Sequence, residues 1–218
     1  MVAKLTRENF ALAAGMALAV IITAAALIAM SATAQPASAT VGQAAPAFSE
    51  PTASGDTVSL SDFEGQTVVL EWTNHLCPFV QKHYNPEHAN MQRLQNEAAI
   101  DEIVWISVIS SAPGKQGHVD AEEALRIVAD NAARPSHVIL DADGSMGRAY
   151  GAKTTPHMFV IRGDGTLAYD GAIDSEPSAR VADIPKATNY LRMAMASVAA
   201  GEPADPATTK PYGCSVKY

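Results

Sequence analysis

The chain has 218 residues, which is enough for one domain with a hydrophobic core of its own. Its formal net charge is −8, from 23 acidic and 15 basic residues. Binding to a phosphate backbone needs clustered lysine and arginine, so this composition excludes nucleic acid as an expected partner.

The first 34 residues have the pattern of a signal peptide. Lys4 and Arg7 precede an uncharged apolar run over residues 10–30, and Ala32-Thr33-Ala34 forms an A-x-A cleavage site. A run of about 20 apolar residues also suits an uncleaved N-terminal membrane anchor. In both cases we expect the rest of the chain in the periplasm, in contact with a membrane only if this segment is retained. Residues 35–47, rich in Ala, Pro, Ser and Thr, are predicted to be a linker.

Strand and helix patterns alternate through residues 48–200, the predicted domain. A buried strand is expected where β-branched and apolar residues run together, and a hairpin where Asp164-Gly165 separates two strands. The predicted strands are 58–60, 67–72, 103–109, 138–140, 157–161 and 167–169. The predicted helices are 78–99 (interrupted near Pro86), 120–132, 145–150 and 184–200.

This order of elements indicates an α/β fold, with a central mixed β-sheet flanked by helices. The order resembles that of a thioredoxin-like domain with an inserted helix. Trp72 and Trp105 are expected in the core on adjacent strands. Residues 201–218 are predicted to form a C-terminal tail that carries Cys214. We expect this tail to move, because residues 203–210 lack an apolar face that would hold it to the core.

The two cysteines, Cys77 and Cys214, are the main chemical feature of the exported part. Cys77 follows a buried strand and precedes Pro78, a residue suited to the first turn of a helix. A sulfur at the start of a helix faces unpaired backbone N–H groups, which favour the thiolate and lower the pKa. A thiolate is the nucleophile in disulfide exchange and in peroxide reduction. The pair fits a redox couple or a structural disulfide equally well.

The segment Trp72-Thr73-Asn74-His75-Leu76-Cys77-Pro78-Phe79-Val80, with Thr155-Pro156 and the later hairpin, resembles the thioredoxin superfamily. Over residues 41–200 it is most similar to the peroxiredoxin-like, alkyl hydroperoxide reductase and thiol-specific antioxidant (redoxin) group. The resemblance implies that Cys77 is the attacking cysteine and that Pro156 is the cis-proline beside it, preceded by Thr155. Val80 stands where thioredoxins carry a second cysteine, and Asn74 where peroxidatic members carry Thr or Ser.

Cys214 is therefore the candidate resolving thiol. His75, in its protonated form, is expected to stabilise the Cys77 thiolate. These residues predict an exported thiol oxidoreductase without a cofactor. It would act on protein disulfides or peroxides and would be reduced by an external thiol. The alternative is a binding module for a partner or a metal, in which Cys77–Cys214 is a structural disulfide. In the metal version Cys77, His75 and His83 are the ligands. Lys82 and His88 are predicted to be solvated residues on a helix face.

Overall fold

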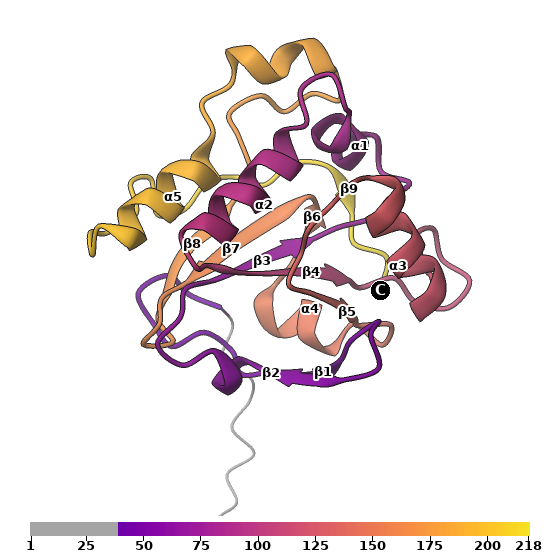
Figure 1. Ribbon diagram of the computed structural model, residues 1–218, viewed down its shortest axis with the longest axis horizontal. Helices are drawn as coiled ribbons and strands as arrows, with labels where there is room; N and C mark the ends of the chain where they lie inside the picture. The colour runs from indigo at the N-terminus through magenta and orange to yellow at the C-terminus, as the bar shows by residue number, and fades with distance from the viewer. Residues whose placement is uncertain (1–38) are drawn as a thin grey trace, which may run out of the picture. The chain divides into compact units, whose positions relative to one another are not determined.

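The computed structural model describes residues 39–218, so the predicted signal peptide or anchor lies outside the described part. No helix within residues 39–218 is long and apolar enough to cross a membrane. A five-stranded mixed sheet of order β5-β4-β3-β7-β8 forms the centre, as predicted (Figure 1). Its strands are β3 (Val68–Trp72), β4 (Val104–Ile109), β5 (His137–Leu140), β7 (His157–Ile161) and β8 (Leu167–Gly171).

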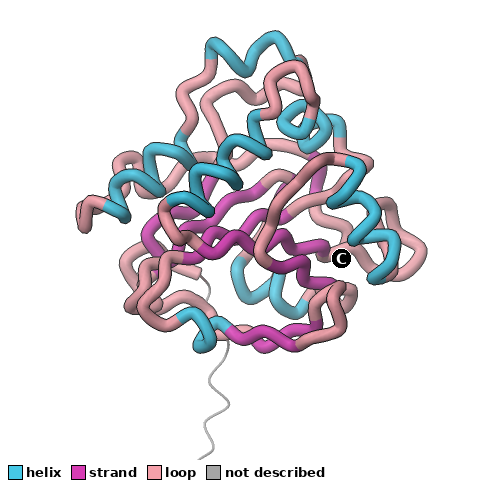
Figure 2. The backbone as a smooth tube through the Cα atoms, viewed as in Figure 1, coloured by secondary structure: helices cyan, strands magenta, loops and turns pink. Residues whose placement is uncertain are grey.

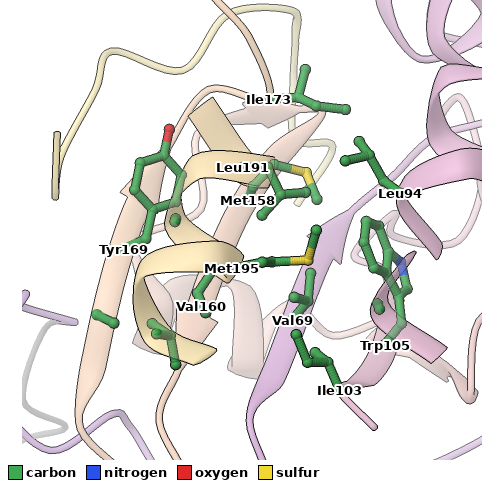
Figure 3. Close-up of a cluster of buried hydrophobic side chains, with 14 of the residues drawn as sticks. Val69, Leu94, Ile103, Trp105, Met158, Val160, Tyr169, Ile173, Leu191 and Met195 are labelled. Carbon is green, nitrogen blue, oxygen red and sulfur yellow. The ribbon is translucent and has the colours of Figure 1, made fainter. Parts of the chain in front are cut away.

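Helices cover both faces of this sheet (Figure 2), because alternate strand residues point to opposite sides. The helices α2 (Asn90–Ile100) and α5 (Tyr190–Ala199) lie side by side on one face. Figure 3 shows their shared core, in which Val69, Trp105 and Leu191 pack together. The other face packs against α4 (Ser145–Tyr150), and α3 (Ala121–Asp130) packs on β5. Both tryptophans are buried on neighbouring strands, as expected.

Two predicted helices have different limits in the structure. The first is interrupted as predicted, with α1 (Pro78–Tyr84) ending before Pro86 and α2 beginning at Asn90. The closing helix is shorter than the predicted 184–200, because a 3₁₀ helix (Val181–Lys186) containing Pro185 comes first. The α-helix then starts at Tyr190, where the side chain of Asn189 accepts a hydrogen bond from the N–H of Arg192.

Short elements complete the domain at its N-terminal side. β1 (Ser49–Pro51), which the sequence analysis missed, pairs with β2 (Thr57–Ser59), and a 3₁₀ helix (Leu60–Phe63) follows. The described part of the predicted linker belongs to the fold. Gly42 N–H donates to Leu167 O over 2.8 Å, and Ala45 N–H donates to Gly165 O over 2.9 Å.

The C-terminal tail is held against the domain, so the expectation of an unpinned tail is wrong. Ala204 is buried in the core beside α5, and the Thr209 hydroxyl accepts a 2.8 Å hydrogen bond from Ala172 N–H. Further along, β9 (Cys214–Ser215) pairs antiparallel with β6 (Thr154–Thr155). Hydrogen bonds, the buried Ala204 and isolated aromatic side chains such as Tyr212 hold this segment, and these contacts are not spaced as one regular apolar face.

Candidate active site

Cys77 lies where strand β3 gives way to helix α1, as the sequence predicts. It is the N-cap residue of α1, and its carbonyl accepts hydrogen bonds from the N–H groups of Val80 and Gln81. Asn74 shapes the preceding loop: its side chain accepts from Leu76 N–H (2.9 Å) and donates to Gln116 O (3.2 Å). The side chain of Cys77 is completely shielded from solvent, at 0% exposure.

The Thr155-Pro156 element lies directly against the sulfur of Cys77. The peptide bond between these two residues is cis. The Cys77 thiol donates a hydrogen bond of 3.1 Å to the carbonyl oxygen of Thr155. The Thr155 side chain is buried as well and lies within hydrogen-bond reach of the Cys77 sulfur. The sequence motif thus contributes both a carbonyl oxygen and a hydroxyl group to the surroundings of the sulfur.

The tail brings Cys214 to the same place. Cys214 stands opposite Thr155 in the β6–β9 pair, and its thiol lies within hydrogen-bond reach of the Cys77 sulfur. Both cysteines are free thiols. The fold therefore unites the two cysteines that the sequence places at opposite ends of the domain.

The surroundings give the two thiols opposite acidities. Burial alone raises the pKa of Cys77, but hydrogen bonds from the Cys214 side chain, the Thr155 hydroxyl and the N–H groups of Cys214 and Val80 outweigh it. The net effect lowers the pKa of Cys77 below its ordinary value. Burial and the neighbouring Cys77 raise the pKa of Cys214 to about 11. In the reduced pair, Cys77 is therefore the more acidic thiol, and Cys214 can donate a hydrogen bond to the Cys77 thiolate when that forms.

His75 does not have the charge that we expected of it. It is half-buried, and this burial lowers its pKa below 6.5, so the ring is neutral at neutral pH. The groups that lower the pKa of Cys77 most are Cys214, Thr155 and Val80, and His75 is not among them. His75 instead lines a small cavity of about 30 Å³ between α1, β4 and α3, together with Val80 and Tyr84.

The prediction of a solvated Lys82 is wrong. Lys82 is only 1% exposed, and its ammonium group donates to Glu176 O over 2.9 Å and lies 3.6 Å from the Asp174 carboxylate. A buried cation requires such a partner. His88, the other residue predicted to be solvated, is half-buried and lies 3.9 Å from Glu87.

His83 is buried beside Lys82, and both of its ring nitrogens are engaged. Nδ1 lies 2.9 Å from the Asn90 amide, and Nε2 lies 3.2 Å from the Tyr212 hydroxyl. Burial and the charge of Lys82 lower the pKa of His83 to about 3. Within residues 39–218, no three His, Cys, Asp or Glu side chains are grouped to hold a metal ion. The predicted set of Cys77, His75 and His83 is therefore not brought together as a metal site.

The sequence analysis missed Glu71, a fully buried carboxyl group on β3. Its oxygens accept hydrogen bonds from Trp105 Nε1 (2.9 Å), the Ser107 hydroxyl (3.1 Å) and the Tyr84 hydroxyl (2.9 Å). Burial raises the pKa of Glu71 despite these donors. The available signal was a single charged residue inside an otherwise apolar strand, six positions before Cys77.

We expect Glu71→Gln to remove part of the pH dependence of stability. Because the pKa of Glu71 is raised by folding, the native state keeps a proton that the unfolded state loses above about pH 4.5. The free energy of unfolding should therefore fall as the pH rises from the pKa of Glu71 in the unfolded state to its raised pKa in the native state. The fall should be up to about 1.4 kcal/mol per pH unit. The free energy of unfolding, measured by urea denaturation at each pH from 4 to 7, should fall less steeply with pH in the variant than in the wild type. Equal slopes would show that Glu71 titrates normally.

The comparisons with known proteins agree with this geometry. The Redoxin family model matches residues 40–191. No curated protein is similar enough to count as a match.

Solved structures show the same fold. An uncharacterized conserved protein from Geobacillus kaustophilus is 21% identical, with a TM-score of 0.69 over 82% of this chain and 92% of its own. A hypothetical protein from Sinorhizobium meliloti 1021 is 23% identical, with a TM-score of 0.69 over 83% and 96%. A protein from Chlorobium tepidum assigned as the thiol:disulfide interchange protein DsbE is 24% identical, with a TM-score of 0.54 over 74% and 99%.

The family match covers well over half of the chain and spans the strand that leads to Cys77, the helix that begins after it and the Thr155-Pro156 element. The mixed sheet and the cis-proline beside the cysteine agree with it. The chain therefore belongs to the redoxin family, within the thioredoxin-like superfamily.

Proposed function

We propose that this protein is an exported thiol–disulfide oxidoreductase in which Cys77 attacks and Cys214 resolves. The observation that carries the proposal is the position of Cys214, opposite Thr155 in the β6–β9 pair and within hydrogen-bond reach of the Cys77 sulfur. The surroundings of the pair also differ, since they lower the pKa of Cys77 and raise that of Cys214. The attacking group must be a thiolate, whereas Cys214 has to remain a thiol until the mixed disulfide on Cys77 has formed. A purely structural disulfide needs no such difference.

The reaction follows from this order. The Cys77 thiolate attacks one sulfur of a substrate disulfide, which forms a mixed disulfide and releases the first substrate thiolate. Cys214 loses its proton and attacks the Cys77 sulfur, which releases the second substrate thiol and forms Cys77–Cys214. The substrate gains two electrons and the protein loses two. Two equivalents of an external thiol then reduce the internal disulfide, are themselves oxidised to a disulfide, and restore the two protein thiols.

Asn74 favours a disulfide over a peroxide as the oxidant. It occupies the place of the Thr or Ser that peroxidatic relatives carry, and its amide group is engaged by Leu76 and Gln116. Export to the periplasm accords with this chemistry, because disulfides persist in oxidising compartments. The signal-peptide pattern of residues 1–34 supports that location.

The proposed role of Cys214 as proton donor is tested by the pH dependence of Cys77 alkylation. The midpoint in the wild type should lie below the roughly 8.5 of a free cysteine. Cys214→Ala removes a hydrogen bond to the thiolate and should raise the midpoint. Cys214→Ser keeps a donor at the same position and should leave the midpoint close to the wild-type value.

Iodoacetamide labelling, with the Cys77 peptide quantified by mass spectrometry, measures all three midpoints. A wild-type midpoint at or above that of a free cysteine would argue against an activated nucleophile. Identical midpoints in the Ala and Ser variants would show that the Cys214 thiol does not stabilise the thiolate.

A further inference from the structure

The buried state of Cys77 conflicts with its proposed role. A nucleophile must approach the sulfur of its substrate, yet the Cys77 side chain has 0% exposure. The covering element includes residues 208–218, which we call the strap. Its strand β9 lies along β6 and places Cys214 against the Cys77 sulfur. In Figure 1 the strap is the yellow segment that includes β9 and ends at the C-terminus.

The strap occupies the place that a substrate needs. The residue opposite Thr155 in the β6–β9 pair is a cysteine, with its sulfur beside that of Cys77. A disulfide in an extended peptide would have to bring one of its sulfurs to this same point. Backbone pairing to an exposed strand edge is a common way to bind such a peptide. The strap and an incoming peptide cannot use the edge of β6 at the same time.

One anchor holds the strap on the side that precedes Cys214. The Tyr212 hydroxyl donates to Asp174, and the Tyr212 ring packs edge-on against Phe79, with centroids 5.9 Å apart. Next to it, Gly213 passes so close to the carbonyl of Thr155 that any side chain there would collide with it. This anchor uses the buried charges around Lys82, whose ammonium group lies 5.5 Å from the centre of the Tyr212 ring.

A second anchor holds the other end, at Tyr218. Its ring lies over Gly144 and Gly147 of the α4 region, where a Cβ atom on either glycine would meet the ring. The guanidinium of Arg148 lies 4.7 Å from the ring centre, and the Tyr218 hydroxyl donates to Ala152 O over 3.0 Å. This anchor lies on the other side of Cys214 from Tyr212, and it uses no residue of the proposed reaction.

We propose that the strap is an intramolecular occupant of a peptide-docking edge. A partner protein binds by laying an extended, disulfide-bearing segment along β6 in its place. This inference rests on the proposed function, because it assumes that the incoming segment carries the disulfide that Cys77 attacks. When the strap is docked, Cys77 is protected and Cys214 stays beside it. When the strap leaves, the edge of β6 and the Cys77 sulfur become available together.

The test weakens the distant anchor and measures access to Cys77 in the full-length, reduced protein. Tyr218→Ala removes the ring, and Gly147→Ala fills the place where the ring lies while suiting a helix. Both should speed iodoacetamide labelling of Cys77 at constant pH by about tenfold or more, since the rate follows the open fraction. Tyr218→Phe keeps the ring and should stay within about twofold of the wild type. Labelling rates in both Ala variants that equal the wild-type rate would overturn the proposal.

A peptide added in trans tests the docking edge itself. A synthetic peptide of residues 209–218, with serine in place of the cysteine, should slow the labelling of Cys77 in the Tyr218→Ala protein. A scrambled peptide should not. If the first peptide also has no effect, the strap covers Cys77 without occupying a docking edge, and the proposal fails. Labelling needs no disulfide turnover, so a failure of the proposed function is seen separately, as absent disulfide reduction with unchanged labelling differences.

Discussion

Cys77→Ser is expected to abolish disulfide reduction, with a loss of at least about a thousandfold, because no other thiolate can form the mixed disulfide. Cys214 cannot replace it, since burial raises the pKa of Cys214 in the variant as well and so disfavours its thiolate. The measurement is multiple-turnover reduction of a disulfide-bearing peptide, with glutathione as reductant. The same assay with hydrogen peroxide in place of the disulfide shows which oxidant the protein prefers.

The serine variant should fold normally, because a hydroxyl group can make the same hydrogen bond to Thr155. A thermal unfolding midpoint close to that of the wild type would show that the variant is folded. Leu125→Ala, on the exposed surface of α3, provides a matched control for activity. If Cys77→Ser retained substantial turnover, the attacking group would have to be sought elsewhere.

Cys214→Ser is expected to separate the two chemical steps. The first attack should remain close to the wild-type rate, because the serine hydroxyl still supports the Cys77 thiolate. Multiple turnover should fall about a hundredfold or more when glutathione is limiting, because nothing inside the protein breaks the mixed disulfide. Mass spectrometry should find the substrate thiol attached to Cys77. Turnover at the wild-type rate would instead mean that an external thiol resolves the intermediate.

The sequence predicted the sheet and the position of the nucleophile because both depend on local patterns. Apolar runs identified the buried strands, and Pro78 after a strand marked the start of α1 at Cys77. The break before α2 and the hairpin of β7 and β8 likewise follow from local signals at Pro86 and Gly165. The Thr155-Pro156 element was found through the family resemblance, and the structure gives it a cis bond.

Features that depend on contacts distant in sequence were not predictable in the same way. Lys82 resembles a solvated helix residue until Asp174 and Glu176, almost a hundred positions later, come to face it. The docking of the strap depends on Tyr212 and Tyr218, which meet α1 and α4 only in the folded chain. Glu71 is the exception, because a lone carboxylate in an apolar strand was a local signal that we did not use.

The central claim is that Cys77 and Cys214 form a catalytic disulfide, and one stoichiometric oxidation tests it most directly. Reduced full-length protein is mixed with one equivalent of oxidised glutathione, quenched with acid and digested without reductant. Mass spectrometry should then show a Cys77–Cys214 linked pair of peptides and two equivalents of released glutathione. Glutathione that remains attached to Cys77, with Cys214 still a free thiol, would contradict the claim.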